Sequence, residues 1–473
     1  MRPLARLAAP LALAVLAGCA VGPGYHRPEI AAPPRHRDAP PQTDSLASFA
    51  DLAWWQAMPD TTLQSLVREA LANNHDLRIA VARVEAARAS SGIAGAPLWP
   101  WLSAGASGSH LERSEYFGVR DPIPTNNFQY GGSVSWELDV FGRVRRQKEA
   151  AVAEEAAAEY DQRGVAMSLV AEVARQFIQL RELDMRLEIA HRTLDSREAT
   201  LKLFTRRHTG GVASGLEISQ AKGDLQDVAS VIPNLERQVA MTENSLSALL
   251  GRNPGPIVRD TLLDLRLSPP QVPSGLPSQL LERRPDVMAA EERLRAANAR
   301  VGVATALYFP SIDLSAFLGG MKLELPDGST SNPSAWSVGG SLFQPLFQAG
   351  RIRNVNRAAR AEYDASREQY LGAAQNSFRE VADALVTVGK TREQVGHLDL
   401  RVAALAEGSR LAKVRYDGGL SSYLEVLDAD RQLFAGENDL AGARGNLWRA
   451  YVELYRTLGG GWTVPADSTT AHH

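Results

Sequence analysis

The sequence predicts a mostly helical chain with a smaller antiparallel β part, built by an internal duplication. Three observations predict this fold class. Two stretches of about 200 residues carry the same landmarks in the same order, long proline-free segments repeat apolar residues every seven positions, and short segments alternate apolar and polar residues.

Composition limits the classes of protein to consider. The 473 residues carry a formal net charge of −3, 44% are hydrophobic, and one is cysteine. The near-neutral charge argues against a nucleic-acid-binding protein, and one cysteine excludes an intrachain disulfide and a Cys-rich zinc site.

An export signal is predicted at the start. Arg2 and Arg6 precede an apolar run at 7–17, which is shorter than the roughly 20 residues that span a bilayer. Small residues then lead to Cys19, which resembles the bacterial lipobox, where cleavage leaves an N-terminal cysteine carrying diacylglycerol and palmitate-type acyl chains. By the same resemblance, Ala20 in the next position favours outer-membrane sorting, since an Asp there would be the usual signal to stay at the inner membrane. A plain secretory signal with an incidental cysteine is the alternative.

Four landmarks define the duplication. The first two landmarks recur at an offset of 210 residues, so that Asp76 corresponds to Asp286. The last two recur at an offset of 208 residues, so that Gly142 corresponds to Gly350. The pairs are Asn74-His75-Asp76-Leu77 with Arg284-Pro285-Asp286-Val287, Leu98-Trp99-Pro100 with Tyr308-Phe309-Pro310, Gly142-Arg143 with Gly350-Arg351, and Gly211–Glu217 with Gly419–Glu425.

Each repeat is predicted to run through the same elements. An Ala-, Leu-, Glu- and Arg-rich helix comes first, at about 60–96 and 277–306. Pro100 and Pro310 then suit strand starts, because a missing N–H is tolerated there. Two strands, a very long helix, a Gly-Gly turn and a return helix follow.

The long helices show the strongest periodicity. No proline occurs between Arg143 and His208, and a helix of that length extends roughly 100 Å. Such a helix needs equally long neighbours, as in a coiled coil. The heptad positions are Ala166, Val173, Leu180, Leu187, Leu194 and Leu201 with Leu169, Leu183, Ala190 and Phe204, and in the second repeat Val381, Val388, Val395 and Val402 with Leu398 and Leu405.

The strands are predicted from alternation of apolar and polar residues. Apolar positions are Phe128, Tyr130, Val134, Trp136, Leu138 and Val140, then Ile312, Leu314, Ala316 and Leu318, then Trp336, Val338 and Leu342. A soluble half-buried sheet is one reading. The strand length also suits a transmembrane barrel, which needs at least eight strands, so four strands per chain would require two or three copies.

Catalytic constellations are not found. The sequence holds no His-Glu-x-x-His, Gly-x-Ser-x-Gly, Walker-type or Gly-x-Gly-x-x-Gly motif, and its histidines are scattered. We therefore expect no enzyme activity, no cofactor and no metal site.

The second Gly-Gly turn carries the residues of greatest interest. Tyr416 precedes it, and Leu424, Glu425 and Asp428 follow on one face of the next helix. In the first repeat Glu217 matches Glu425, whereas a glutamine stands opposite Asp428. The plainer alternatives are that Glu425 closes a capping box with an N-cap serine and that Asp428 is a solvated surface residue.

With these motifs in place, the chain resembles the TolC-type outer membrane efflux proteins, specifically the lipoprotein outer membrane factors of tripartite efflux systems. Its most specific segments are Cys19–Tyr25 with Pro28, Leu281–Val287 with Ala289–Glu291, Ala296–Ala299, Phe309–Ile312 and Tyr423–Ala429. Gly24, where the family usually has Asp, and Met58-Pro59 after Trp54-Trp55 depart from the pattern.

The resemblance implies a homotrimer in which a long α-helical barrel carries a twelve-stranded antiparallel β-barrel, with four strands from each chain. It implies passive export of drugs or other small molecules, together with a periplasmic adaptor and an inner-membrane RND-type transporter. It also implies a lipid-anchored protein in the outer membrane, extending into the periplasm. A periplasmic coiled-coil adaptor or scaffold lipoprotein without a pore is the alternative.

The resemblance also assigns a pore constriction. Leu424 would form an apolar ring and Asp428 an acidic ring, with Glu425 near it. Tyr416 matches a tyrosine that helps to hold the closed coils together in some members. The arginine that often shares this role is replaced by Ser421.

The predicted organisation has six segments. They are a signal peptide at 1–18, a lipid-anchored segment at 19–59, repeat 1 at 60–250, an equatorial linker at 251–276, repeat 2 at 277–458 and a flexible tail at 459–473.

Overall fold

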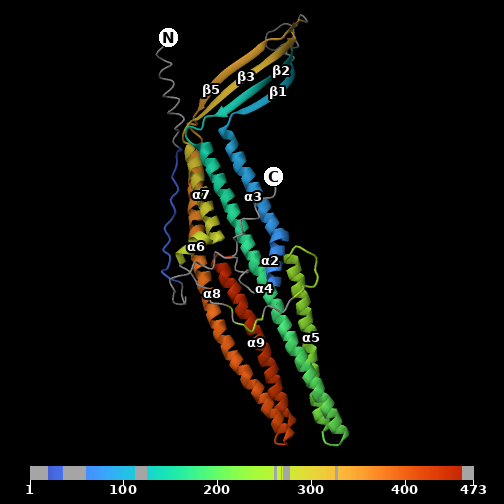
Figure 1. The fold of residues 1–473 in the computed structure, drawn as a ribbon. Coiled ribbons are helices and arrows are strands. Elements are labelled where there is room, and N and C mark those ends of the chain that lie inside the picture. Colours follow the sequence, from blue (N-terminus) through green and yellow to red (C-terminus); the bar gives the residue numbers. More distant parts are fainter. Residues whose placement is uncertain are drawn as a thin grey trace. The chain divides into compact units, whose positions relative to one another are not determined.

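A computed structural model describes the chain over residues 20–35, 60–111, 125–259, 264–267, 269, 277–324 and 329–460. The predicted signal peptide and Cys19 lie outside the described residues. The chain divides into two compact units (Figure 1). We call 1–29, 83–159 and 289–371 the strand unit, and 30–82, 160–288 and 372–473 the helical unit. Over the described ranges, no helix combines the length and apolar character needed to span a bilayer.

The two repeats contain matching elements, as the duplication predicts. The long helices α4 and α8 have 67 residues each, and the return helices α5 and α9 have 35 each. The described elements are α2 Thr61–Asn73, α3 His75–Gly95, η3 Ala96–Leu98, β1 Trp101–Leu111, β2 Thr125–Glu137, α4 Arg143–Thr209, α5 Gly215–Leu249, α6 Pro277–Arg283, α7 Pro285–Ala306, β3 Ser311–Glu324, β4 Thr330–Ser331, β5 Ser334–Phe343, α8 Arg351–Asp417 and α9 Tyr423–Thr457.

The first helix of each repeat is interrupted, which corrects the single helices expected at 60–96 and 277–306. Asn74 separates α2 from α3, because its side chain accepts a hydrogen bond from the Leu77 amide at 3.0 Å and donates to the Leu249 carbonyl at 2.9 Å. Its counterpart Arg284 separates α6 from α7, and Pro285 then begins the new helix without needing an amide donor.

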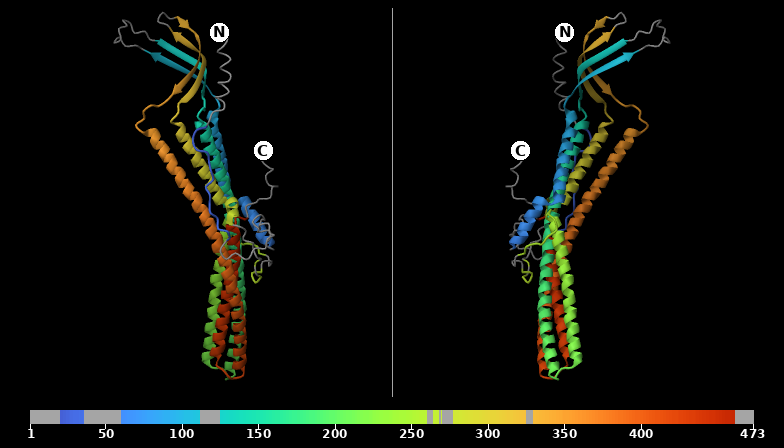
Figure 2. Two further views of the ribbon diagram at one scale, coloured as in Figure 1. Left: turned by 90° about the vertical axis from the view of Figure 1, so that its left-hand side faces the viewer. Right: turned by 90° about the vertical axis from the view of Figure 1, so that its right-hand side faces the viewer.

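The strand unit holds a single antiparallel sheet in the order β1-β2-β3-β5, with the short β4 also paired to β3. Figure 2 shows the sheet from two opposite sides. The pairing places even-numbered residues of all four main strands on one face, for example Leu102 beside Val134 and Leu318 beside Trp336. The predicted alternation is therefore confirmed. The apolar face is exposed in the single chain, with Trp336 and Val338 each 77% exposed.

The second strand is shorter than the alternation suggested. Leu138 and Val140 lie beyond its end at Glu137. The chain turns there because Asp139 accepts hydrogen bonds from the amides of Val144 and Arg145, at 2.9 and 2.8 Å, and so caps the start of α4.

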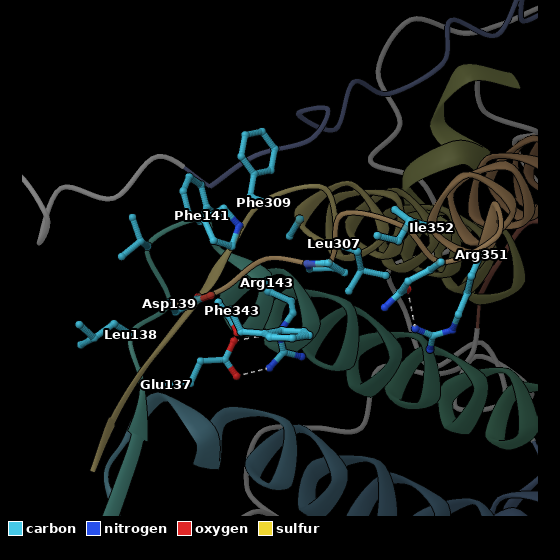
Figure 3. Close-up of a pocket in the computed structure, with 16 residues that line it drawn as sticks. Glu137, Leu138, Asp139, Phe141, Arg143, Leu307, Phe309, Phe343, Arg351 and Ile352 are labelled. Carbon is cyan, nitrogen blue, oxygen red and sulfur yellow. Dashed lines mark hydrogen bonds and ion pairs between the residues drawn. The ribbon is translucent and has the colours of Figure 1, made fainter. Parts of the chain in front are cut away.

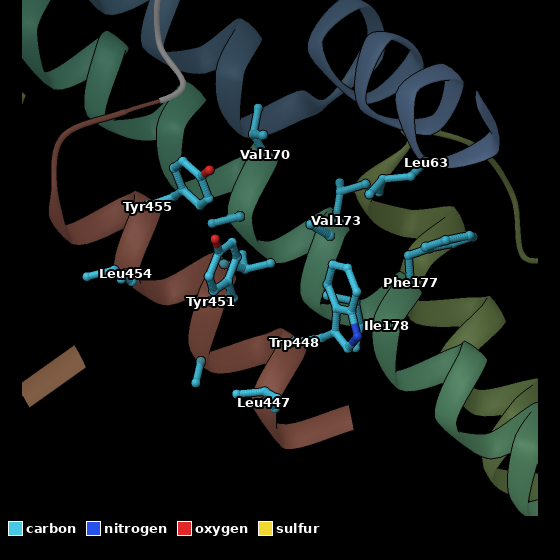
Figure 4. Close-up of a cluster of buried hydrophobic side chains, with 14 of the residues drawn as sticks. Leu63, Val170, Val173, Phe177, Ile178, Leu447, Trp448, Tyr451, Leu454 and Tyr455 are labelled. Carbon is cyan, nitrogen blue, oxygen red and sulfur yellow. The ribbon is translucent and has the colours of Figure 1, made fainter. Parts of the chain in front are cut away.

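The helical unit packs the lower parts of α4 and α8 with α5 and α9. The four helices lie side by side in Figure 1 and in both views of Figure 2. Their apolar seam follows the predicted heptads, with Val173, Leu180 and Val381 fully buried. Figure 4 shows the core where Phe177 of α4, Trp448 of α9 and Leu63 of α2 belong to one cluster.

Candidate functional site

The two hairpin turns have the same backbone structure. Gly211 and Gly419 end α4 and α8 in the left-handed region, with φ values of 78° and 71°. The amides of Val212 and Leu420 then return to the carbonyls of Arg207 and Arg415, each at 2.8 Å. This is a glycine-dependent helix stop, and glycine is favoured because a side chain would be strained at positive φ.

The return helices begin differently. Ser214 and Glu217 form a capping box at the start of α5. Ser422 is the N-cap of α9, but its side chain makes no capping bond. The capping-box alternative for Glu425 is therefore wrong in this structure. The Glu425 carboxylate instead lies 3.5 Å from the Arg415 guanidinium, and both side chains are about half exposed.

Tyr416 connects the two hairpins. Its hydroxyl donates a hydrogen bond to Glu217 at 3.0 Å, and its ring meets Phe204 of α4 edge-on at 6.0 Å and Tyr423 of α9 at 5.8 Å. The Ser214 backbone amide, assisted by Tyr416, holds the pKa of Glu217 below its usual range, while burial and the Glu217 charge raise the pKa of Tyr416. Nearby, Arg207 of α4 lies 3.6 Å from Asp417 of α8, a pair that the sequence analysis did not identify.

The predicted constriction residues share one exposed stripe of α9. Leu424 is 59% exposed, and Glu425 and Asp428 are exposed beside it. Asp428 accepts a hydrogen bond from Gln432 one turn further on, at 2.7 Å. The opposite side of the helix, which includes Tyr423 and Val426, is buried. The structure thus brings the three side chains together on one accessible face.

A buried ionic cluster lies behind that stripe and was missed in the sequence. Arg197 of α4 is 5% exposed and pairs with Asp224 of α5 and Asp430 of α9. Burial disfavours the Asp430 charge, but hydrogen bonds from Ser409 and Arg197 outweigh it and hold the pKa of Asp430 below its usual range. A signal was present, because Arg197 occupies the heptad position three residues after Leu194, where apolar residues are otherwise frequent.

The strand unit contains a cavity of about 300 Å³ at the junction of strands and helices (Figure 3). Its charged groups already have structural partners. Arg143 donates two hydrogen bonds to Glu137, at 3.0 and 2.5 Å, and Asp139 caps α4. Phe141 and Phe309 stack at 4.8 Å beside them. The arrangement braces the start of α4 and offers no arranged nucleophile or acid–base pair.

Metal ligation is not indicated in the part of the chain that the structure describes, which contains no group of three or more His, Cys, Asp or Glu side chains placed to hold an ion.

Comparison with known proteins gives consistent matches over nearly the whole chain. A model of the outer membrane efflux protein family matches residues 66–252 and 276–460. A probable efflux pump outer membrane protein, TtgC of Pseudomonas putida, is 34% identical over 467 residues, covering 95% of this chain and 94% of the relative.

Two solved structures are similar in fold. The outer-membrane channel OprN is 33% identical with a TM-score of 0.81, covering 94% of this chain and all of that one. CusC, whose title refers to transmembrane channel formation, is 31% identical with a TM-score of 0.84 over the same shares.

Proposed function

The chain belongs to the outer membrane efflux protein family, and we propose that three copies assemble into one duct through which drugs or other small molecules leave the cell. As a member of this family it is an outer membrane channel for efflux that extends into the periplasm. This membership favours a channel over the alternative of a pore-less adaptor or scaffold.

The sheet supports assembly from several copies. Four main strands leave β1 and β5 as edge strands and expose an apolar face. A membrane-spanning sheet must close on itself, since unpaired backbone groups are costly in lipid, and closed barrels need at least eight strands. Three copies would supply twelve, and the choice of three over two rests on the family resemblance.

The stripe of Leu424, Glu425 and Asp428 is our candidate for the narrowest part of the duct. It is the single observation that carries the gate assignment, because these side chains are exposed in one chain while the opposite side of α9 is packed. Around a threefold axis, three Leu424 side chains would form an apolar constriction and three Asp428 carboxylates would attract cations. Tyr416, bonded to Glu217, would hold the hairpins of each chain together in the closed state.

The hairpin tips are the candidate contact for a periplasmic adaptor. Equivalent positions of the two repeats expose apolar side chains there, with Val212 81% and Leu420 74% exposed. Exposed apolar patches of this kind mark interaction sites. An adaptor docked on them would link the duct to an inner-membrane RND-type transporter, which supplies the energy. We assign no catalytic role and no cofactor to the chain itself.

The position of Val21 supports a lipid anchor at Cys19. Val21 donates a hydrogen bond to the Phe141 carbonyl at 3.1 Å, so the segment starts beside the junction of β2 and α4. A lipid attached just before Ala20 would therefore enter the membrane next to the strands. Cys19→Ser should abolish incorporation of radiolabelled palmitate, and continued labelling would refute the anchor.

Two measurements test the proposed function. In cell fractionation the wild-type protein should be recovered with the outer membrane, and after purification it should form cation-preferring pores in planar bilayers. The Leu424→Ala and Asp428→Ala double variant should conduct more current with less cation preference. Unchanged conductance and selectivity in this variant would refute the gate assignment, and a wild-type protein without pore activity would refute the duct.

A further inference from the structure

The buried cluster around Arg197 joins the four long helices α4, α5, α8 and α9. The Arg197 guanidinium lies 2.6 Å from Asp224 of α5 and also pairs with Asp430 of α9. Asp430 further accepts a hydrogen bond from Ser409 and lies 3.1 Å from the Lys413 ammonium, both on α8. One side chain of α9 is therefore fixed by groups from two other helices.

The cluster lies on the side of α9 opposite the proposed constriction. At 3.6 residues per turn, Asp430 is displaced from Asp428 by about 160° around the helix axis. Asp430 is 6% exposed, whereas Asp428 is exposed. Contacts that hold Asp430 against α4 and α8 therefore favour a rotation of α9 that leaves Leu424 and Asp428 exposed.

Stability alone does not account for these charges. Replacing a buried ion cluster by well-packed apolar residues is often neutral or stabilising. The duplication shows that leucine is accepted at two of these positions, because the counterparts of Arg197 and Ser409 in the other repeat are Leu405 and Leu201. Unlike leucine, arginine can bond a specific carboxylate. Such a bond favours one rotation of a helix about its axis over other rotations.

We propose that Arg197 is a positioning residue of the constriction, which fixes the rotation of α9 through Asp430 so that Asp428 faces the axis of the duct. The inference rests on the proposed function, since it needs a pore whose ion preference depends on Asp428. It assigns Arg197 no contact with the transported molecule.

A double-mutant cycle on ion selectivity tests the proposal. Single-channel reversal potentials under a KCl gradient give the cation-to-anion permeability ratio of full-length wild type, Arg197→Met, Asp428→Ala and the double variant. We expect Arg197→Met to remove at least half of the cation preference that Asp428→Ala removes. The double variant should match Asp428→Ala alone, because the rotation of α9 cannot affect cation preference through Asp428 once its carboxylate is absent.

Two further variants keep the test decisive. Arg410→Met removes an exposed pair with Glu407 on α8, one residue from Ser409, and should retain the wild-type ratio. Asp430→Asn preserves side-chain volume and replaces Arg197→Met in the cycle if that variant does not form pores.

The result that would overturn the proposal is a wild-type permeability ratio in Arg197→Met, or independent effects of the two substitutions. An equal loss in Arg410→Met would also overturn it, by showing a general effect of removing helix charge. A wild-type chain that conducts no current would instead refute the proposed function.

Discussion

The internal duplication predicts how neighbouring copies pair in the proposed barrel. Within one chain, Ser133 of β2 pairs with Phe317 of β3. Trp101 of β1 pairs with Ser135 of β2, and Ser311 of β3 pairs with Phe343 of β5 in the same way. The duplication therefore relates β1 to β3 by 210 residues and β2 to β5 by 208. The residues equivalent to Ser133 and Phe317 are therefore Ser341 and Ser107. If β5 of one copy pairs with β1 of the next copy as β2 pairs with β3 within a chain, Ser341 of one copy lies opposite Ser107 of the next.

This register is sharp enough to test by disulfide trapping. Directly paired residues have Cα atoms about 4.5–5.5 Å apart, within the roughly 4.4–6.8 Å that a disulfide accepts. A shift of two residues along the strand adds a displacement of about 6.8 Å, which places the same pair outside that range.

We expect the Ser341→Cys and Ser107→Cys double variant to form disulfide-linked trimers, resolved by non-reducing electrophoresis. The matched control combines Ser341→Cys with Ser109→Cys, which lies on the same face two residues away, and should remain monomeric on the gel. Cross-linking in the control in place of the test pair would refute the register. Dimers as the largest linked species would refute the threefold assembly.

Three further predictions concern the hairpin tips and a helix junction. Tyr416→Phe keeps the ring but removes the hydroxyl that donates to Glu217, so open probability in bilayers should rise roughly fivefold, equivalent to about 1 kcal/mol; an unaltered open probability would contradict the role of this bond. The pKa of Glu217 is held below its usual value of 4.5, so the contribution of its charge to closure is complete above that value and is lost as pH falls through the lowered pKa. Conductance should accordingly rise in acid, and Tyr416→Phe should weaken that rise. Asn74→Ala removes both the cap of α3 and a bond to α5, so thermal denaturation should show a loss of about 1–2 kcal/mol, and an unchanged midpoint would be the contrary result.

Much of the fold follows from local sequence signals. Seven-residue repeats through Val173 and Leu180 predicted the 67-residue helices, and alternation around Leu314 and Trp336 predicted one apolar sheet face. These signals are strong because each residue position on a helix or strand has a fixed direction. The breaks at Asn74 and Arg284 were not predicted, since Asn74 acts through a bond to Leu249, 175 residues away.

The site was predicted only in part. Tyr416, Leu424, Glu425 and Asp428 were identified from their spacing and from the family resemblance, and the structure places the last three on one exposed stripe. The capping role considered for Glu425 failed, because Ser422 and Ser214 look alike in sequence while only Ser214 closes a capping box. That difference lies in side-chain geometry, which the two similar turn sequences do not specify.

The sequence by itself determined the duplication, the long paired helices, the alternating sheet and the family, because all of these depend on residue order and periodicity. Only the tertiary structure decided what Arg197, Asp224 and Asp430 do together. These residues come from three helices, and each carboxylate could have been solvated on its own helix. Burial removed that option and made a specific partner necessary, because a buried charge without one is strongly unfavourable.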